Sequence, residues 1–169
     1  MYQRHAARAA SVMAIVLTTG QLGCAPQAAR PLDEATRSAI TDTIRAESAR
    51  MLDVMRSREG EAVLAFYGRH TAYAGDGAVG DWEAIRAGTV PRYATYTKVD
   101  CHWGSPLRID VLARTSAVVT GVLDCQKADT TGKAWHEFGA RTEVLAPEEG
   151  RWRIVAVHES SAPGSAGLK

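Results

Sequence analysis

The hydrophobic periodicity of the chain changes once, and this change constrains the fold more than any other feature. In the N-terminal half, mostly apolar positions recur at spacings of four and three: Ile40, Ile44, Ser48, Met51 and Met55. Asp33 precedes this stripe as a suitable N-cap, so we expect an amphipathic helix from Glu34 to about residues 58–60. Shorter helices are expected at 61–67 and from Asp81 to about Ala87, with a brief strand at 71–74.

The C-terminal half is instead rich in β-branched and aromatic residues. It predicts five strand segments, at residues 96–103, 107–112, 117–126, 134–145 and 151–160. Gly104-Ser105-Pro106 separates the first two, which favours a bend within one long strand. Helices followed by a meander of strands predict an α+β fold, in which a curved antiparallel sheet carries the helices on one face.

Residues 75–80, Gly-Asp-Gly-Ala-Val-Gly, match the glycine spacing of dinucleotide-binding loops. Such a loop belongs between a strand and a full crossover helix, whereas here a short helix and antiparallel-looking strands follow. Asp76 and Asp81 would also face the pyrophosphate with negative charge. We therefore interpret the segment as a turn with Asp81 as the next helix cap, and we expect no cofactor.

The charge balance argues against nucleic acid as a partner. The chain has 20 basic and 19 acidic residues, and the sequence contains no basic stripe. The histidines outside the first 23 residues, at positions 70, 102, 136 and 158, show no chelating spacing, so we expect no metal site. The nucleophile elbow of α/β-hydrolases is also absent from the sequence.

The first 23 residues have the pattern of an export signal. Arg4 and Arg8 precede an apolar run from Ala9 to Leu17 that is too short to cross a bilayer. Gln21-Leu22-Gly23-Cys24 then resembles the lipobox of bacterial lipoproteins, although Gln21 replaces the usual aliphatic residue. This resemblance implies lipidation at Cys24 and an anchored protein of the periplasm or cell envelope; free secretion is the alternative. Residues 24–32 would form a tether, 33–160 the domain and 161–169 a tail.

Cys101 and Cys125 lie on predicted strands that flank a turn at 113–116. A simple hairpin would place residue 101 opposite about 128, and the bend at 104–106 can absorb this slip. In an oxidising compartment we therefore expect a disulfide between them. A reactive thiol assisted by His102 is the alternative, but neighbouring residues of a strand point to opposite faces.

Several local strings resemble the nuclear transport factor 2-like (NTF2-like) superfamily, especially its SnoaL-like branch. The strings are Glu61–Tyr67, Gly80–Arg86, Ser116–Gly121, Arg141–Val144, Gly150–Val155 and His158–Ser160, in the family's order over about residues 34–160. The resemblance implies a cone-shaped sheet with about three N-terminal helices on its concave face, around a pocket. Family members include isomerases, dehydratases, cyclases, non-catalytic binders and dimerisation modules, so the fold selects no single function.

Strand alternation places Trp152, Ile154, Ala156 and His158 on one face, which the resemblance identifies as the pocket side. His158 is then a candidate acid, base or ligand contact, with Tyr73 and Asp76 as further catalytic candidates. The alternative is a His158 that bonds to a neighbouring group at the rim. The expected lining residues are Tyr67, Tyr73, Trp82, Trp103, His136, Phe138, Trp152 and His158, although ordinary core packing also explains aromatic residues. We interpret Arg141 as a structural ion-pair partner.

Three functions follow from these features. The first is binding of a small, partly apolar molecule without chemistry. The second is an isomerase-, dehydratase- or cyclase-type enzyme that uses His158; isomerase-like relatives keep a carboxylate on or near the first strand, but residues 71–74 hold none. The third is a homodimerising interaction module.

The lipobox resemblance can be tested on the mature protein. We expect mass spectrometry of the N-terminal peptide from membranes to show Cys24 as the first residue, carrying acyl chains. An unmodified N-terminus at another residue would be compatible with export but would contradict the lipid anchor at Cys24.

Overall fold

The predicted amphipathic helix is present in the computed structural model, which describes residues 31–162, as α1 (Glu34–Ser57). Asp33 caps it, because its carboxylate accepts a hydrogen bond from the Thr36 backbone N–H at 2.7 Å, and this bond lowers the pKa of Asp33. The helix ends at Arg58, which adopts a left-handed backbone with φ of 64°. The export signal, Cys24 and the tail beyond residue 162 lie outside the described residues.

Two shorter helices follow, α2 (Gly60–Leu64) and α3 (Trp82–Thr95). Asp81 caps α3 as predicted, accepting from the Ala84 N–H at 3.0 Å. The expected end near Ala87 is wrong, because α3 continues through Pro91. Proline removes a helical hydrogen bond, but the buried Tyr93 anchors the last turn, so tertiary packing outweighs the local propensity.

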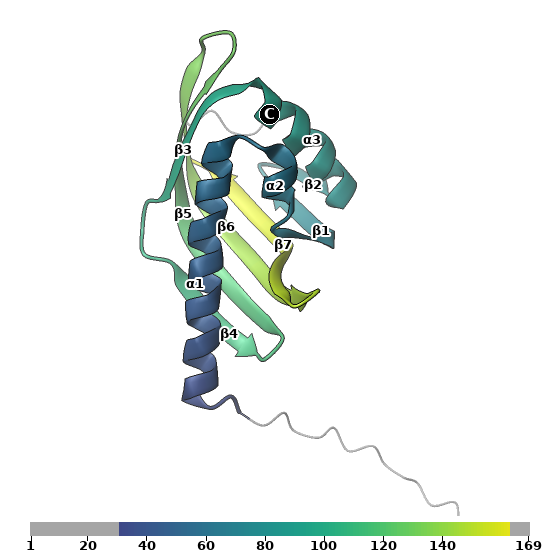
Figure 1. The fold of residues 1–169 in the computed structure, drawn as a ribbon, viewed down its shortest axis with the longest axis vertical. Coiled ribbons are helices and arrows are strands. Elements are labelled where there is room, and N and C mark those ends of the chain that lie inside the picture. The colour runs from purple at the N-terminus through teal and green to yellow at the C-terminus, as the bar shows by residue number, and fades with distance from the viewer. Residues whose placement is uncertain (1–30, 163–169) are drawn as a thin grey trace, which may run out of the picture. The chain divides into compact units, whose positions relative to one another are not determined.

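Seven strands form one curved sheet: β1 (Tyr67–Gly75), β2 (Ala78–Gly80), β3 (Tyr96–Trp103), β4 (Arg108–Ala113), β5 (Ser116–Asp129), β6 (Ala134–Glu148) and β7 (Arg151–Ser161). Their order is β2-β1-β7-β6-β5-β3, with β4 also paired to β5. The three helices lie on the same side of this sheet (Figure 1). The α+β prediction is confirmed, with one correction: β1 and β7 pair in parallel, so the sheet is mixed. Local sequence patterns do not determine a pairing between strands so distant in the chain.

The bend at residues 104–106 divides one sheet edge as predicted, because β3 and β4 both pair with β5. The glycine-rich loop forms the tight β1–β2 hairpin, whose turn holds Asp76 and Gly77 at φ values of 45° and 83°. A left-handed backbone at both positions is typical of such turns.

A bulge in β7 changes which side chains face the helices. Ile154 pairs with Leu145 and Ala156 with Val144, so Val155 is an extra residue in the ladder. The fully buried Thr71 hydroxyl lies 2.7 Å from the Ile154 carbonyl oxygen at this point. Beyond the bulge the predicted alternation is wrong: Val157 is buried, whereas His158 is exposed.

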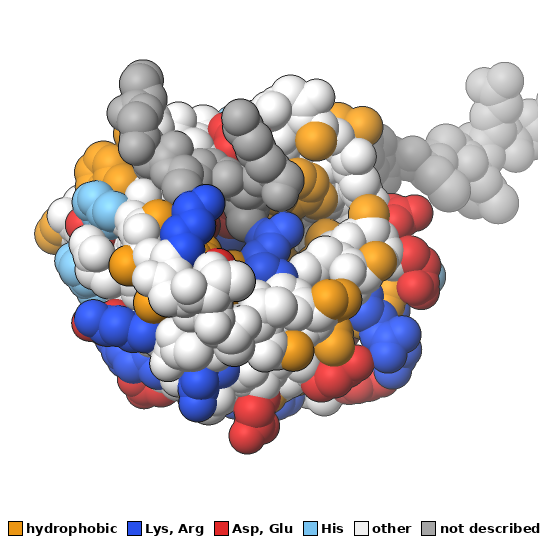
Figure 2. Space-filling model, turned by 90° about the horizontal axis from the view of Figure 1, so that it is seen from above, with side chains coloured by type: hydrophobic (Ala, Val, Ile, Leu, Met, Phe, Trp, Pro, Cys, Tyr) orange, Lys and Arg blue, Asp and Glu red, His pale blue; other side chains and the backbone are white. Residues whose placement is uncertain are grey.

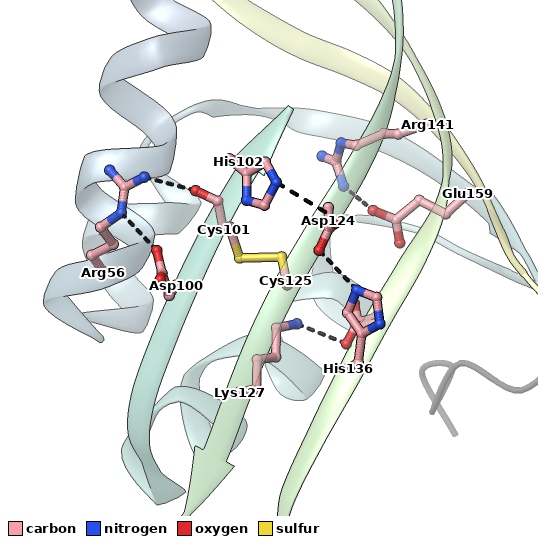
Figure 3. The surroundings of a disulfide bond; sticks show 11 residues. Arg56, Asp100, Cys101, His102, Asp124, Cys125, Lys127, His136, Arg141 and Glu159 are labelled. Carbon is pink, nitrogen blue, oxygen red and sulfur yellow. Dashed lines mark hydrogen bonds and ion pairs between the residues drawn. A yellow bond between two sulfur atoms is a disulfide. The ribbon is translucent and has the colours of Figure 1, made fainter. Parts of the chain in front are cut away.

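The predicted disulfide is confirmed. Cys101 and Cys125 are directly paired across β3 and β5, with their Cα atoms 4.1 Å apart, and both are fully buried under α1. Arg56 of α1 donates a hydrogen bond to the Cys101 carbonyl oxygen at 2.8 Å (Figure 3). The bridge therefore ties the edge strand β3 to the inner strand β5 beneath the helix.

Replacing both cysteines by alanine is expected to lower the free energy of unfolding by about 3 kcal/mol, because the unfolded chain loses a constraint. Urea denaturation followed by circular dichroism measures this change. Reduced wild type should match the double variant, and a double variant as stable as oxidised wild type would contradict the structural role.

Candidate functional site

A cavity of about 310 Å³ lies between the helices and the inner face of the sheet. Its apolar walls include Met51, Met55, Val63, Ile85, Leu123 and Val157. Four tyrosines contribute rings with polar tips: Tyr67, Tyr73, Tyr93 and Tyr96. Six charged residues also line it: Asp76, Arg92, Lys127, Glu137, Arg141 and Glu159. This combination of apolar wall and a few inward polar groups is typical of small-molecule sites.

Arg141 organises the deepest part of the pocket. Its guanidinium, on β6, donates to the Glu143 carboxylate at 2.6 Å, to the Tyr67 hydroxyl at 2.7 Å, and also to the Glu159 carboxylate. Burial by itself lowers the pKa of Arg141, but its interactions with Tyr67 and Glu143 outweigh this effect and raise the pKa. Arg141 is thus permanently charged and paired with two carboxylates, in agreement with its interpretation as a structural ion-pair partner. Because Arg141 uses the Tyr67 oxygen as an acceptor, the Tyr67 O–H remains able to donate into the cavity.

A second charged pair lies in the same pocket on β5 and β6. Lys127 donates from Nζ to Glu137 at 2.8 Å, and only 5% of the lysine side chain is exposed. Burial lowers the pKa of Lys127, and the nearby Arg92 and Arg141 lower it further, although Glu137 acts in the opposite direction. Figure 3 shows Lys127 extending from β5 toward β6, close to the disulfide.

Arg92 differs from the other two pocket cations. It projects from the last turns of α3 past Gly88, where a side chain would come within 3.7 Å of Nη2. Among residues 31–162, no carboxylate lies within ion-pair distance of its guanidinium, and the salt bridges of the domain all join other residues. Figure 2 shows Lys and Arg side chains bordering a hollow at one end of the domain. Arg92 therefore supplies unmatched positive charge to the pocket wall.

Three tyrosine hydroxyls of the pocket, those of Tyr73, Tyr93 and Tyr96, stay protonated at neutral pH because the pKa of each is raised. Burial raises the pKa of Tyr96 to about 12, and burial also raises the pKa of Tyr93. For Tyr73 the pKa is raised by burial and then by the Asp76 charge. These groups can accept or donate hydrogen bonds to a ligand without contributing charge.

Asp76 lies at the pocket wall but is already bonded. Its carboxylate accepts from the Ser161 backbone N–H at 2.9 Å and from the Ser161 hydroxyl at 2.6 Å. The pKa of Asp76 is lowered chiefly by these bonds. The carboxylate thereby fastens the β1–β2 turn to the end of β7. Ser161 is part of the domain, one residue beyond the predicted boundary at 160.

The structure brings only some of the predicted residues together. Tyr67, Tyr73 and Asp76 line the cavity, whereas the other predicted residues do not: Trp82, Trp103, His136, Phe138, Trp152 and His158. His158 lies on the outer face because of the β7 bulge. His136 also lies on the outer face, where its Nε2 is 2.8 Å from the Asp124 carboxylate (Figure 3). Trp103 and Trp152 pack against the core.

Sequence reasoning missed Arg92, Lys127 and Glu137. Glu137 and Arg141 line the cavity from one face of β6, whereas the predicted lining residues His136 and Phe138 lie on the other face. Lys127 is two residues from Cys125, so strand alternation places both on the same buried face. A third helix that ends near Ala87 would not include Arg92, whereas the observed α3 carries it at the pocket wall.

Among residues 31–162, no group of three or more His, Cys, Asp or Glu side chains is arranged to hold a metal ion. No helix in the same range has both the length and the apolar character needed to span a bilayer.

Comparisons with known proteins define the fold class. The family model of the calcium/calmodulin dependent protein kinase II association domain matches residues 106–163, which contain β4 to β7. No curated protein sequence matches the chain. Several solved structures have a similar fold.

An NTF2-like superfamily protein from Salmonella enterica serovar Typhimurium has a TM-score of 0.61 and 20% identity, covering 80% of this chain and 97% of that one. The association domain of C. elegans calcium/calmodulin dependent protein kinase II gives 0.58 and 18%, covering 76% and 99%. Hexachlorocyclohexane dehydrochlorinase LinA-type3 from Novosphingobium barchaimii gives 0.61 and 10%, covering 81% and 99%. The chain is thus an α+β domain with helices on one face of a curved, mixed sheet. Its fold is NTF2-like.

Proposed function

We propose that this domain binds a small, partly apolar molecule that carries a carboxylate or similar anion. Arg92 is the observation that supports this most directly, since its charge is unmatched within the described residues and borders the cavity. Around Lys127, two cations, Arg92 and Lys127, face one carboxylate, Glu137. Arg141 adds no free charge, because Glu143 and Glu159 already pair with it. An anion would therefore find a counter-charge without a carboxylate partner at Arg92.

The rest of the cavity suits an apolar body. Met51, Met55 and Leu123 offer deformable or branched apolar surface, and the tyrosine rings offer flat contacts. A volume of about 310 Å³ accommodates a molecule of the size of a substituted aromatic acid. The apolar contacts would supply affinity, and Arg92 would fix the orientation of the ligand.

Catalysis through His158, the second function considered, has less support. His158 is exposed and does not line the cavity, and Asp76 is occupied by Ser161. Tyr67 and Tyr73 remain as pocket hydroxyls, but the described residues offer no histidine among the pocket-lining groups. The geometry therefore favours ligand binding over a reaction catalysed by His158.

Arg92→Gln is expected to weaken binding of 4-methylbenzoate by about tenfold or more, because a hydrogen bond to a charged group contributes about 1.5–3 kcal/mol. Isothermal titration calorimetry and thermal shift measure the change. Arg86→Gln is the matched control, because Arg86 lies on the same helix but pairs with Glu61 at 3.0 Å outside the pocket. Equal binding by both variants, or no preference of wild type for the acid over 4-methylbenzamide, would refute the anion site.

Self-association is a second candidate function, supported by the match of residues 106–163 to an association-domain model. The strands in this range expose an apolar side chain on the outer face, Phe138, which is 38% exposed. We expect sedimentation velocity at micromolar concentration to show a dimer or larger assembly that Phe138→Asp weakens. Val79→Asp, at the β1–β2 hairpin, where the side chain is 88% exposed, serves as the control. A monomeric wild type would count against this role.

We also propose that the protein is exported and held at the cell envelope through Cys24. The buried Cys101–Cys125 bridge supports an oxidising compartment, since such bonds are rare in the cytosol. The analysis of the mature N-terminus described above tests the anchor.

A further inference from the structure

Lys127 is a buried amine that ligand binding alone does not use. Its Nζ lies 2.8 Å from Glu137 and 5.7 Å from the centre of the Tyr96 ring, and the residue lines the cavity. The chain has four lysines, at 98, 127, 133 and 169. Of the three within the described range, Lys98 and Lys133 are exposed and do not line the cavity.

We propose that Lys127 is a nucleophile that forms an imine with the aldehyde or ketone group of a carboxylate ligand held by Arg92. The ligand class is therefore a small oxo acid. This inference rests on the proposed anion site and adds covalent capture to it.

Three observations support the proposal. First, the amine is enclosed by the wall of a cavity large enough for the ligand. Second, Glu137 is the only carboxylate bonded to Nζ among residues 31–162, so one acceptor is in place for the proton that the ammonium must lose. Third, burial with Arg92 and Arg141 nearby lowers the pKa of Lys127 and so increases the fraction of neutral amine at neutral pH.

The chemical step balances without an external oxidant or reductant. The Lys127 ammonium transfers one proton to Glu137, and the nitrogen lone pair then forms a C–N bond to the carbonyl carbon. The carbonyl π electrons move to oxygen, and the second proton of the nitrogen passes to this oxygen to give a carbinolamine. Protonated Glu137 then returns the proton it accepted to the hydroxyl, which leaves as water while the nitrogen lone pair forms the C=N bond. The products are one protonated imine, which keeps the third proton of the ammonium, and one water, and Glu137 is again a carboxylate.

Reductive trapping tests the proposal on the full mature protein. Glyoxylate and 4-carboxybenzaldehyde are the probes, each with sodium cyanoborohydride at neutral pH, followed by peptide mass spectrometry of all the lysines. We expect the adduct on Lys127 to exceed that on Lys98 and Lys133 by about tenfold or more, because a carboxylate held by Arg92 keeps the carbonyl group beside this amine and beside neither of the other two. Benzaldehyde, which lacks the carboxylate, should label Lys127 much less.

Lys127→Arg is the main variant, because it keeps a cation beside Glu137 but cannot form the imine. It should abolish pocket labelling while the labelling of Lys98 and Lys133 and the circular dichroism spectrum are unchanged. Glu137→Gln should slow trapping by either probe at Lys127 while the labelling of Lys98 stays the same.

The two proposals fail differently. If 4-methylbenzoate binds in an Arg92-dependent way but neither probe labels Lys127 above the surface lysines, covalent capture is wrong and the anion site stands. If benzaldehyde labels Lys127 as well as 4-carboxybenzaldehyde does, and Arg92→Gln is labelled as well as wild type, the amine is reactive but the oxo-acid class of the ligand is wrong. If no carboxylate binds and no adduct forms, both proposals are wrong.

Discussion

The guanidinium of Arg141 is the interaction on which the pocket depends. It joins three strands, because Glu143 lies on β6 beside it, Glu159 comes from β7 and Tyr67 comes from β1. Burying a charge is costly unless it is paired and hydrogen-bonded, and removing one partner of such a pair costs about 3–5 kcal/mol. Each of the three guanidinium nitrogens of Arg141 has one such partner. The same contacts orient Tyr67 at the cavity wall, so the structural network and the binding surface share their residues.

Two further devices hold the walls around this centre. The buried Thr71 hydroxyl, within hydrogen-bond distance of the Gly68 and Ile154 carbonyl oxygens, fills the irregular region where β1 meets β7 in parallel. On the opposite edge, the disulfide joins β3 to β5 under α1. Both lie where regular strand pairing is weakest: at a bulge and at a sheet edge. The helices then close the cavity by apolar packing, without needing charged contacts to every strand.

The sequence predicts those structural features in which a residue interacts with others close to it in the chain or in a neighbouring hairpin strand. The Asp33 and Asp81 caps, the 104–106 bend and the Cys101–Cys125 pairing follow from spacing and turn residues, and the structure confirms them. The candidate site was less predictable, because it depends on pairings between distant strands. One extra residue, Val155, reverses the face of His158, and no local pattern marks it. Likewise Arg92 is placed by the burial of Tyr93, which carries α3 past Pro91.

The β7 bulge makes the chemistry of the pocket a matter of strand pairing as well as side-chain identity. Glu159 faces Arg141 only because Val155 is accommodated outside the regular ladder. If Val155 were taken into the ladder, simple alternation would return and Val157, His158 and Glu159 would exchange faces together. A related chain whose last strand pairs without the bulge can therefore present a different pocket surface with the same residues. Comparing residue types column by column would overlook such a change, because each side chain would still be present.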